Sequence, residues 1–346
     1  MNNRMMAAVL YGKEHLQVEP VAVPTIDRGD ILVQVKVALT CGTDVKVFRR
    51  GYHARMIVPP AVFGHELAGD IVAVGEDVTK FALGQRVVSA NSAPCEACYL
   101  CRRGLQNLCE DLLFNNGAYA QFIRIPARIV ERNTYLIPRE VGYQDAALVE
   151  PLACVVRGFE ETAPREGDTI AIVGLGPIGL MFAKLAKLRG CRVIAVGRRK
   201  TQLERAGALG ADELVVAGEG SDPVKAIRGL THGRGVDIAI EAVGLPQTWE
   251  WAVNMVRRGG MVNFFGGCPN ESTVNLDTAL LHYSEITCKA SFHHTPAYVQ
   301  KALDLIYAGH ITASFFVNSE EPLANLLEVM RHLMSHNGHL KTAIVP

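Results

Sequence analysis

Four cysteines stand close together in one segment of the sequence, at Cys95, Cys98, Cys101 and Cys109. Thiolates at such short spacings suit a closed tetrahedral zinc site, which holds a loop in shape and does no chemistry. An iron–sulfur cluster uses related spacings, and four unconnected thiols are the remaining alternative. We favour structural zinc because no proline follows Cys109 in the ferredoxin manner and because Cys109 is spaced more widely than the others.

A second set of metal-binding residue types lies nearer the N-terminus. Cys41 follows a predicted strand, and His65 and Glu66 come further along the chain, just before the β pattern at 67–90. Zinc accepts thiolate, imidazole and carboxylate ligands. A single cysteine after a strand is usually a core residue, and a lone His-Glu pair usually lies on the surface. The set therefore indicates a catalytic metal only if a nicotinamide site accompanies it.

A glycine-rich turn provides the features of such a site. Gly174, Gly176, Pro177, Ile178 and Gly179 lie between a β-branched run at 169–173 and a helical pattern at 180–189, and a second strand follows at 192–196. Glycines let the backbone approach a pyrophosphate, and the helix N-terminus offers free N–H groups to the anion. A chance turn is one alternative; a membrane span is another, but three glycines and a proline argue against it. The motif predicts dinucleotide binding.

The residues after the second strand favour NADP(H) over NAD(H). An acid normally stands there and binds the ribose 2′-hydroxyl, whereas this chain has Gly197, Arg198, Arg199 and Lys200. Two guanidinium groups could hold a 2′-phosphate in a fork. NAD(H) remains possible, because these cations could equally be the solvated start of a helix.

Composition sets the class of protein. The chain has 346 residues, 49% of them hydrophobic, and 35 basic residues balance 35 acidic ones. The balance argues against nucleic acid or an anionic membrane as a partner. The N-terminus lacks a secretion signature, and the nine cysteines suit a reducing compartment better than a disulfide framework, so we expect a cytoplasmic protein.

Hydropathy patterns indicate the elements that position these residues. Short β runs occupy 1–40, 67–90 and 118–126, and a helical pattern begins near Tyr143, with Pro151 expected to break or kink it. From 168 onward strands and helices alternate, which predicts a doubly wound sheet of six strands. Residues 246–260 read as a helix and 261–267 as a strand, whose final Gly266 and Gly267 should face the nicotinamide.

These motifs, together with Glu150-Pro151-Leu152-Ala153, occur in the order seen in zinc-dependent medium-chain dehydrogenases. The chain most resembles the branch that contains polyol (sorbitol) and threonine dehydrogenases. The resemblance implies an α/β fold with a doubly wound, parallel, six-stranded Rossmann domain at 155–292. A β-rich GroES-like catalytic domain would comprise 1–154 with 293–346.

The resemblance also implies roles for single residues. Cys41, His65 and Glu66 would hold a catalytic zinc, with Glu150 as a fourth ligand or as a partner of the zinc-bound water. Thr43 would relay a proton, and Asp44 would orient the His65 imidazole.

Two departures from the family matter. Lys46 stands where many relatives have the histidine that ends the proton relay, and His293-His294 replace an Arg-Tyr pair that faces the substrate in polyol dehydrogenases. We expect both histidines to line the substrate pocket; the alternative is that they belong to a surface loop.

The expected function is hydride transfer between a nicotinamide dinucleotide and a small secondary alcohol of polyol type, with one catalytic and one structural zinc per chain. A threonine-type amino-alcohol dehydrogenase is the alternative, and for its carboxylate substrate Arg49, Arg50 and Arg55 are candidate partners. A catalytically silent dinucleotide-binding protein is the alternative from another class. The family further implies a homo-oligomer, a tetramer or a dimer.

Overall fold

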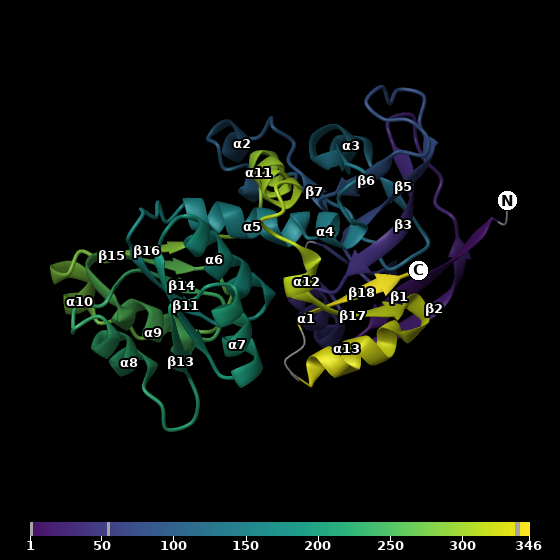
Figure 1. Ribbon diagram of the computed structural model, residues 1–346. Helices are drawn as coiled ribbons and strands as arrows, with labels where there is room; N and C mark the ends of the chain where they lie inside the picture. The colour runs from purple at the N-terminus through teal and green to yellow at the C-terminus, as the bar shows by residue number, and fades with distance from the viewer. Residues whose placement is uncertain (1–2, 54–55, 336–339) are drawn as a thin grey trace. The chain divides into compact units, whose positions relative to one another are not determined.

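The chain divides into two units, one of them formed from both ends of the sequence. The computed structural model describes residues 3–53, 56–335 and 340–346. One unit comprises residues 1–153 and 294–346, and the other comprises Cys154–His293 (Figure 1). Each boundary lies one residue from the division expected from the sequence.

The unit at 154–293, all of whose residues are described, is built on a six-stranded parallel sheet with strand order β13-β12-β11-β14-β15-β16. The order reverses between β11 and β14, as in doubly wound nucleotide-binding folds. This confirms the predicted Rossmann architecture. The strands are β11 (Thr169–Val173), β12 (Arg192–Gly197), β13 (Glu213–Val216), β14 (Val236–Glu241), β15 (Val256–Phe264) and β16 (Thr287–Ala290).

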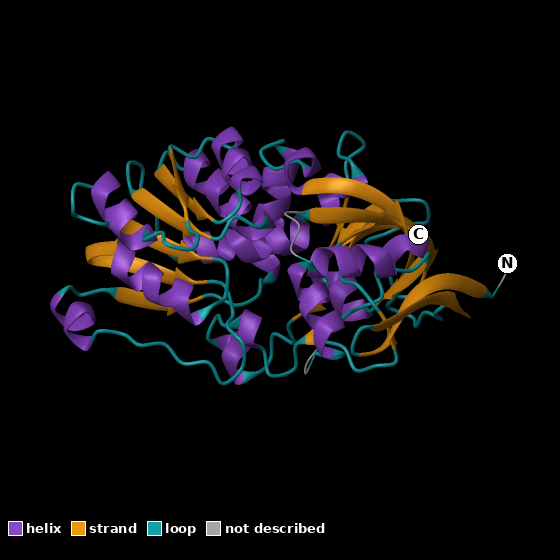
Figure 2. Cartoon of the chain, turned by 90° about the horizontal axis from the view of Figure 1, so that it is seen from below, coloured by secondary structure: helices purple, strands orange, loops and turns teal. Residues whose placement is uncertain are grey.

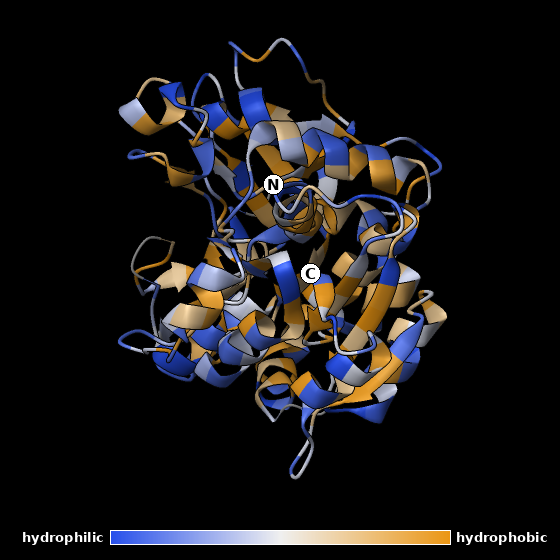
Figure 3. Ribbon diagram, turned by 90° about the vertical axis from the view of Figure 1, so that its left-hand side faces the viewer, coloured by the Kyte–Doolittle hydropathy of each residue, from blue (hydrophilic) through white to orange (hydrophobic). Residues whose placement is uncertain are grey.

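Helices cover both faces of this sheet (Figure 2). Helix α6 packs on α7, and α8 packs on α9. Residues of β11, such as Ile172, are fully buried, as expected for a parallel strand covered on both faces. Hydrophobic residues accordingly concentrate along the strands (Figure 3). The helices are α6 (Pro177–Leu188), α7 (Lys200–Ala208), α8 (Pro223–Leu230), α9 (Pro246–Met255) and α10 (Thr278–Tyr283).

One expected boundary in this unit was wrong. The helix predicted over 246–260 ends at Met255, and β15 begins at Val256 rather than at Met261. Val256 pairs with Val236 of β14, so pairing with a neighbouring strand outweighs the helical pattern of the sequence.

The other unit is rich in β structure, as predicted. Within its described residues a seven-stranded sheet has the order β10-β6-β5-β3-β18-β17, with β9 also paired to β3, and smaller sheets join β2-β1-β4 and β7-β8. Its strands are β1 (Arg4–Gly12), β2 (His15–Ala22), β3 (Ile31–Leu39), β4 (Ala61–Val62), β5 (Glu66–Val74), β6 (Arg86–Ser89), β7 (Ser92–Ala93), β8 (Leu113–Phe114), β9 (Phe122–Ile125), β10 (Thr134–Leu136), β17 (Val317–Pro322) and β18 (Lys341–Val345).

Helices of this unit come from both parts of the chain. They are α1 (Gly42–Arg50), α2 (Tyr99–Arg102), α3 (Ala127–Asn133), α4 (Tyr143–Ala147), α11 (Pro296–Tyr307), α12 (Ala313–Phe316) and α13 (Leu326–Met334), with 3₁₀ turns at Gln106–Leu108 and Leu323–Asn325. The main core cluster includes Phe48, Phe63 and Tyr119, each exposed by 2% or less. None of the helices in the described segments has the length and apolar character that crossing a bilayer requires.

Pro151 acts on the helix that begins near Tyr143, as its sequence position suggested. Helix α4 ends at Ala147, and a new helix, α5 (Val149–Glu160), begins two residues later. Pro151 therefore lies in the first turn of α5, where a helix has no acceptor for the missing N–H. The interruption leaves Glu150 at the start of a helix rather than in the middle of one.

Candidate active site

Cys41 lies at the junction between β3 and α1. It is the N-cap residue of α1, and its Sγ accepts a hydrogen bond from the backbone N–H of Thr43 at 3.4 Å. The Asp44 carboxylate in turn accepts the Cys41 N–H at 3.0 Å. This reciprocal capping box fixes the first turn of α1 and the direction of the Cys41 side chain.

His65 and Glu66 approach Cys41 from β5, which pairs antiparallel with β3. Ligand atoms of Cys41, His65 and Glu66 all lie within 4.8 Å of one another. His65 is 4% exposed and Glu66 is fully buried. Gly64 precedes them at φ +89, and the Tyr119 ring packs where a side chain would stand. Only glycine fits that position, and the turn directs His65 toward Cys41.

Asp44 fixes the orientation of the His65 ring. Its Oδ1 lies 3.0 Å from His65 Nδ1, and its Oδ2 accepts the Tyr119 hydroxyl at 2.6 Å. Contact at Nδ1 leaves Nε2 available to a metal, an arrangement common around histidine ligands. Burial favours a lower pKa for His65, but the Asp44 carboxylate outweighs it and raises the pKa well above the usual value.

Lys341 is a member of the site that the sequence analysis did not identify. Its Nζ lies 2.7 Å from Oε1 and 2.6 Å from Oε2 of Glu66, and both side chains are almost fully buried. Burial favours a lower pKa for Lys341, and the Glu66 carboxylate raises it above the usual value. The available sequence signal was weak, a lysine at the start of an apolar terminal strand.

Glu150 and His294 lie beside this cluster. The Glu150 carboxyl is buried, which raises its pKa, while the charges of His65 and Lys341 act in the opposite direction. His294 is 2% exposed; its Nε2 lies 3.3 Å from Asn91 Oδ1 and 3.9 Å from Glu150 Oε1. His294 is therefore not a surface-loop residue. His293 has a left-handed backbone (φ 67), and its carbonyl accepts a hydrogen bond from Arg157.

Other residues considered from the sequence do not converge on the cluster. Arg49 and Arg50 are exposed in the last turn of α1, at the opposite end of the helix from Cys41, and Arg49 donates to the Met334 carbonyl. Lys46 is exposed on the same helix. Arg55 lies outside the described residues.

The four-cysteine segment forms a separate compact group. The Sγ atoms of its four cysteines all lie within 4.8 Å of one another, with Cys95–Cys101 at 4.0 Å and Cys98–Cys109 at 3.9 Å. A tetrahedral zinc with Zn–S bonds of about 2.3 Å separates its sulfurs by roughly 3.8 Å. Backbone N–H donors, that of Glu110 and then that of Cys101, lower the pKa of the Cys98 thiol to about 6. The spacing and the donors fit a structural zinc.

The glycine turn of the other unit has the geometry of a phosphate-binding turn. Gly174 follows β11 at φ +97, Gly176 caps α6, and Pro177 occupies its first turn. A Cβ at Gly179 would collide with the Gly174 carbonyl oxygen. The helix can therefore start close behind the strand only with glycine at that position. Ile178 follows Pro177 in the same first turn of α6.

Cations stand at the end of the neighbouring strand. Gly197 ends β12, Arg198 is exposed, and Arg199 caps α7. Burial, and then the charge of Arg198, lower the pKa of Arg199. At the end of β15, Gly266 packs closely against Gly244 and Glu241, so that a side chain there would crowd both.

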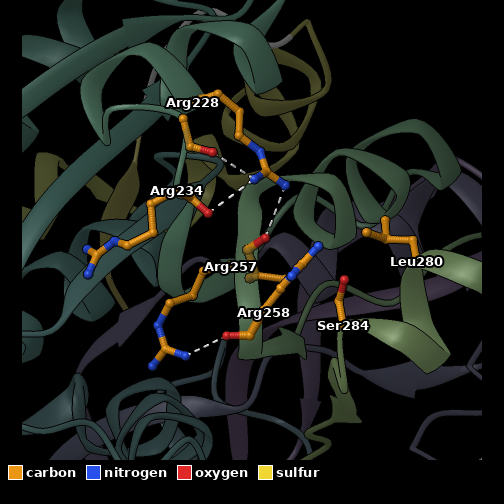
Figure 4. Close-up of a pocket in the computed structure, with 8 residues that line it drawn as sticks. Arg228, Arg234, Arg257, Arg258, Leu280 and Ser284 are labelled. Atoms are coloured by element: carbon orange, nitrogen blue, oxygen red, sulfur yellow. Dashed lines mark hydrogen bonds between the residues drawn. The ribbon is translucent and has the colours of Figure 1, made fainter.

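A basic cavity in the same unit is not the cofactor site. It has a volume of about 640 Å³ and adjoins the first residues of β15 (Figure 4). Ligands of doubly wound sheets bind at the opposite, carboxyl ends of the strands. Its arginines largely hold the backbone: Arg228 donates to the carbonyls of Gly233, Arg234 and Asn254. The cavity is lined by Arg228, Gly233, Arg234, Val256, Arg257, Arg258, Leu280 and Ser284.

Each of the two units matches a known family of protein domains. Residues 27–135 match the model of the alcohol dehydrogenase GroES-like domain, and residues 177–308 match that of zinc-binding dehydrogenases. Sorbitol dehydrogenase of Bacillus subtilis (strain 168) is 31% identical, over 99% of this chain and 97% of that protein. L-threonine 3-dehydrogenase of Bacillus licheniformis is 34% identical, over 73% of each chain.

A solved structure shares the fold along the whole chain. It is a putative zinc-binding dehydrogenase from Sinorhizobium meliloti 1021 bound to NADP, with a TM-score of 0.91 and 28% identity over 99% of both chains. Together with the clustered cysteine, histidine and carboxylate donors, these matches define a nicotinamide-dependent oxidoreductase. The chain belongs to the zinc-binding, medium-chain alcohol dehydrogenase family, and the resemblance seen in the sequence is confirmed.

Proposed function

We propose that this dehydrogenase oxidises a secondary alcohol of the polyol type, and reduces the corresponding ketone, at the site formed by Cys41, His65 and Glu66. The observation that carries the proposal is the convergence of three different donor types within 4.8 Å in a buried site. Relatives named for polyol substrates, sorbitol and D-arabinitol, match along nearly the whole chain.

The donor set fits zinc. Thiolate, imidazole and carboxylate are its usual ligands, and Cys41, His65 and Glu66 would hold the ion. Glu150, whose carboxyl group is buried and feels the charges of His65 and Lys341, would be a fourth ligand or a partner of the water on the ion. When bound, zinc supplies a Lewis acid that polarises the substrate hydroxyl. Two anionic donors, Cys41 and Glu66, make the site a milder acid than one with three neutral histidines.

The chain's own residues orient the site and move the proton. Asp44 holds the His65 ring at Nδ1, and the capping box of α1 directs Cys41 inward. Oxidation releases a hydride from the carbinol carbon to the nicotinamide and a proton from the hydroxyl. We assign Thr43 Oγ1 to relay that proton, accepting it while its own hydroxyl proton passes to solvent water, because Thr43 lies in the first turn of α1 beside Cys41. Buried His294, 3.9 Å from Glu150, would border the substrate, together with His293.

We propose NADP(H) as the preferred cofactor, bound by Gly174, Gly176 and Gly179 at the pyrophosphate. Arg198 and Arg199 would bind the 2′-phosphate, because β12 ends in Gly197 and not in an acid. The NADP-bound structural relative supports this choice. Gly266 and Gly267 would face the nicotinamide.

A second zinc, with a structural role, would be held by the cluster of Cys95, Cys98, Cys101 and Cys109. Sulfur separations of 3.9 and 4.0 Å support it. Closed four-thiolate sites leave no open position for a substrate. This zinc would order the segment around α2.

The threonine-type alternative rests on relatives such as the Bacillus licheniformis enzyme. It has less support in the site, because Arg49 and Arg50 are exposed at the far end of α1. For assembly, we propose a dimer or tetramer, since Tyr283 and Phe292, which flank the edge strand β16, are 80% and 53% exposed.

The test measures the activity of the enzyme on several substrates with each of the two cofactors, together with its metal content. Reduced-nicotinamide absorbance is followed for sorbitol, xylitol, arabinitol, L-threonine and 2,3-butanediol, each with NADP⁺ and NAD⁺, for the native enzyme and Cys41→Ser. Polyol turnover that Cys41→Ser abolishes without loss of dinucleotide binding supports the proposal. Turnover of L-threonine alone establishes the alternative, and unchanged activity in Cys41→Ser refutes the zinc mechanism.

A further inference from the structure

Lys341 uses every donor of its ammonium group within the candidate metal site. Two donors go to Oε1 and Oε2 of Glu66, at 2.7 and 2.6 Å, and the third goes to the Thr40 carbonyl at 3.0 Å. Lysine carries three N–H donors and no acceptor, so the group is fully satisfied. The side chain is 3% exposed, so these protein groups, rather than bulk water, satisfy its donors.

The last strand of the chain holds this lysine in place. β18 pairs with β3, and Thr40 and Thr342 exchange two further hydrogen bonds, of 3.0 and 2.8 Å. Thr40 immediately precedes Cys41. The backbone that carries Lys341 is therefore bonded directly to the backbone that carries a candidate ligand, which leaves the ammonium little freedom to move.

The charges around Lys341 explain what it can do. Glu66, Glu150 and Asp44 are buried carboxyl groups, and the Cys41 thiolate would add a further negative charge once a metal is bound. A buried carboxylate needs a charged partner, and the pairing of Glu66 with Lys341 supplies one. Both oxygens of Glu66 are engaged, so a metal and the ammonium must share the same carboxylate.

We propose that Lys341 is a positioning residue that competes with the bound metal for Glu66 and so limits how strongly this carboxylate donates to the metal. The proposal rests on the proposed function in that Cys41, His65 and Glu66 hold zinc. The ammonium keeps Glu66 a weak ligand, so that the metal keeps its Lewis acidity and can exchange its other partners. Loss of Lys341 leaves Glu66 with the metal as its only strong positive partner.

This competition predicts that loss of Lys341 slows the release of catalytic zinc, whereas structural damage to the site would speed it. Lys341→Met should slow the release of catalytic zinc to a chromophoric chelator by about tenfold or more, the scale of effects from groups behind metal ligands. It should also change the visible spectrum of the Co²⁺-substituted protein. Lys341→Arg keeps the charge and should release zinc within about threefold of the native rate. A merely structural lysine predicts faster release in both variants.

A double-mutant cycle isolates the pair. In the Glu66→Gln background no carboxylate remains to be shared, so adding Lys341→Met should change the release rate by less than about threefold. The release phase of the catalytic site is identified by its absence in Cys41→Ser. If Lys341→Met does not fold, Lys341→Gln replaces it, with the same expectation.

The outcomes separate clearly. Slower release in Lys341→Met, native-like release in Lys341→Arg and a small effect in the Glu66→Gln background support the competition. Equal or faster release in Lys341→Met, or an undiminished effect in the Glu66→Gln background, overturns it. If native protein binds zinc but oxidises no alcohol, the proposed function fails while the release comparison still decides the role of Lys341.

Discussion

Tyr119 holds Asp44 from behind the metal-binding cluster: its hydroxyl donates a 2.6 Å hydrogen bond to Asp44 Oδ2, and both residues are almost fully buried. Asp44 in turn fixes His65 at 3.0 Å. A chain of three side chains therefore runs from the core of the β-rich unit to a candidate ligand. The tyrosine also packs against Gly64, so one ring serves both the backbone turn and the carboxylate.

Tyr119→Phe should weaken this chain without removing its volume. We expect kcat/KM to fall by about tenfold, with partial loss of catalytic zinc, because groups behind metal ligands typically contribute 10–100-fold. Steady-state kinetics and zinc content per chain are the measurements. Tyr11→Phe, which removes an exposed tyrosine hydroxyl that donates to the Glu19 carboxylate, is the matched control. Equal behaviour of the two variants would show that the hydroxyl does not act on the site.

Cys101→Ser should remove the structural zinc alone. One zinc per chain should be lost, the melting temperature should fall, and the folded fraction should keep kcat/KM within a few-fold of native, since a closed site does no chemistry. Zinc analysis and thermal unfolding check this. Cys288→Ser, at an exposed cysteine outside the cluster, is the control. An unchanged zinc content in Cys101→Ser would contradict the assignment.

Arg198→Gln should reduce the preference for NADP⁺. A hydrogen bond to a charged group contributes about 1.5–3 kcal/mol, so KM for NADP⁺ should rise by about tenfold or more while KM for NAD⁺ changes little. Arg189→Gln, also exposed in the same unit but at the end of α6, is the control. An equal change in KM for both cofactors would show that Arg198 does not bind the 2′-phosphate.

Asp237→Asn should destabilise the protein in a pH-dependent way. Asp237 accepts the Thr169 N–H at 2.8 Å and pairs with Arg257. Burial favours a higher pKa for Asp237, but the Thr169 N–H and Arg257 outweigh it and lower the pKa. Because the pKa of Asp237 is lower in the folded protein than in the unfolded chain, its ionised carboxylate stabilises the fold at pH values above the unfolded-state pKa. This stabilisation is lost as the pH falls through the folded-state pKa.

We therefore expect Asp237→Asn to lower the unfolding free energy by about 1–3 kcal/mol at pH 7, and the difference to shrink below about pH 4. Urea unfolding across this range is the measurement, with Glu219→Gln at an exposed carboxylate as control. A deficit that persists undiminished at low pH would mean that the ionised carboxylate is not the stabilising form.

The sequence alone was sufficient for features that are decided locally. The glycine turn at Gly174–Gly179 could be recognised because a strand, a tight turn and a helix start follow one another within a few residues, and each has a local steric requirement. The alternation after residue 168 predicted the six-stranded sheet for the same reason, since strand and helix periodicities are visible within single segments.

Pairing partners distant in the sequence were decided only by the tertiary structure. Lys341 meets Glu66 across 275 residues, Tyr119 meets Asp44 across 75, and His294 lies against Asn91 across 203. The early end of α9 at Met255 likewise depends on the pairing of Val256 with β14. The hydrophobic periodicity of a single segment does not determine which strands become its neighbours, because strand pairing depends on how the whole chain buries its apolar surface. The residues that could hold the metal were therefore visible as types in the sequence, whereas the charges and hydrogen bonds that tune them were set by strand pairing.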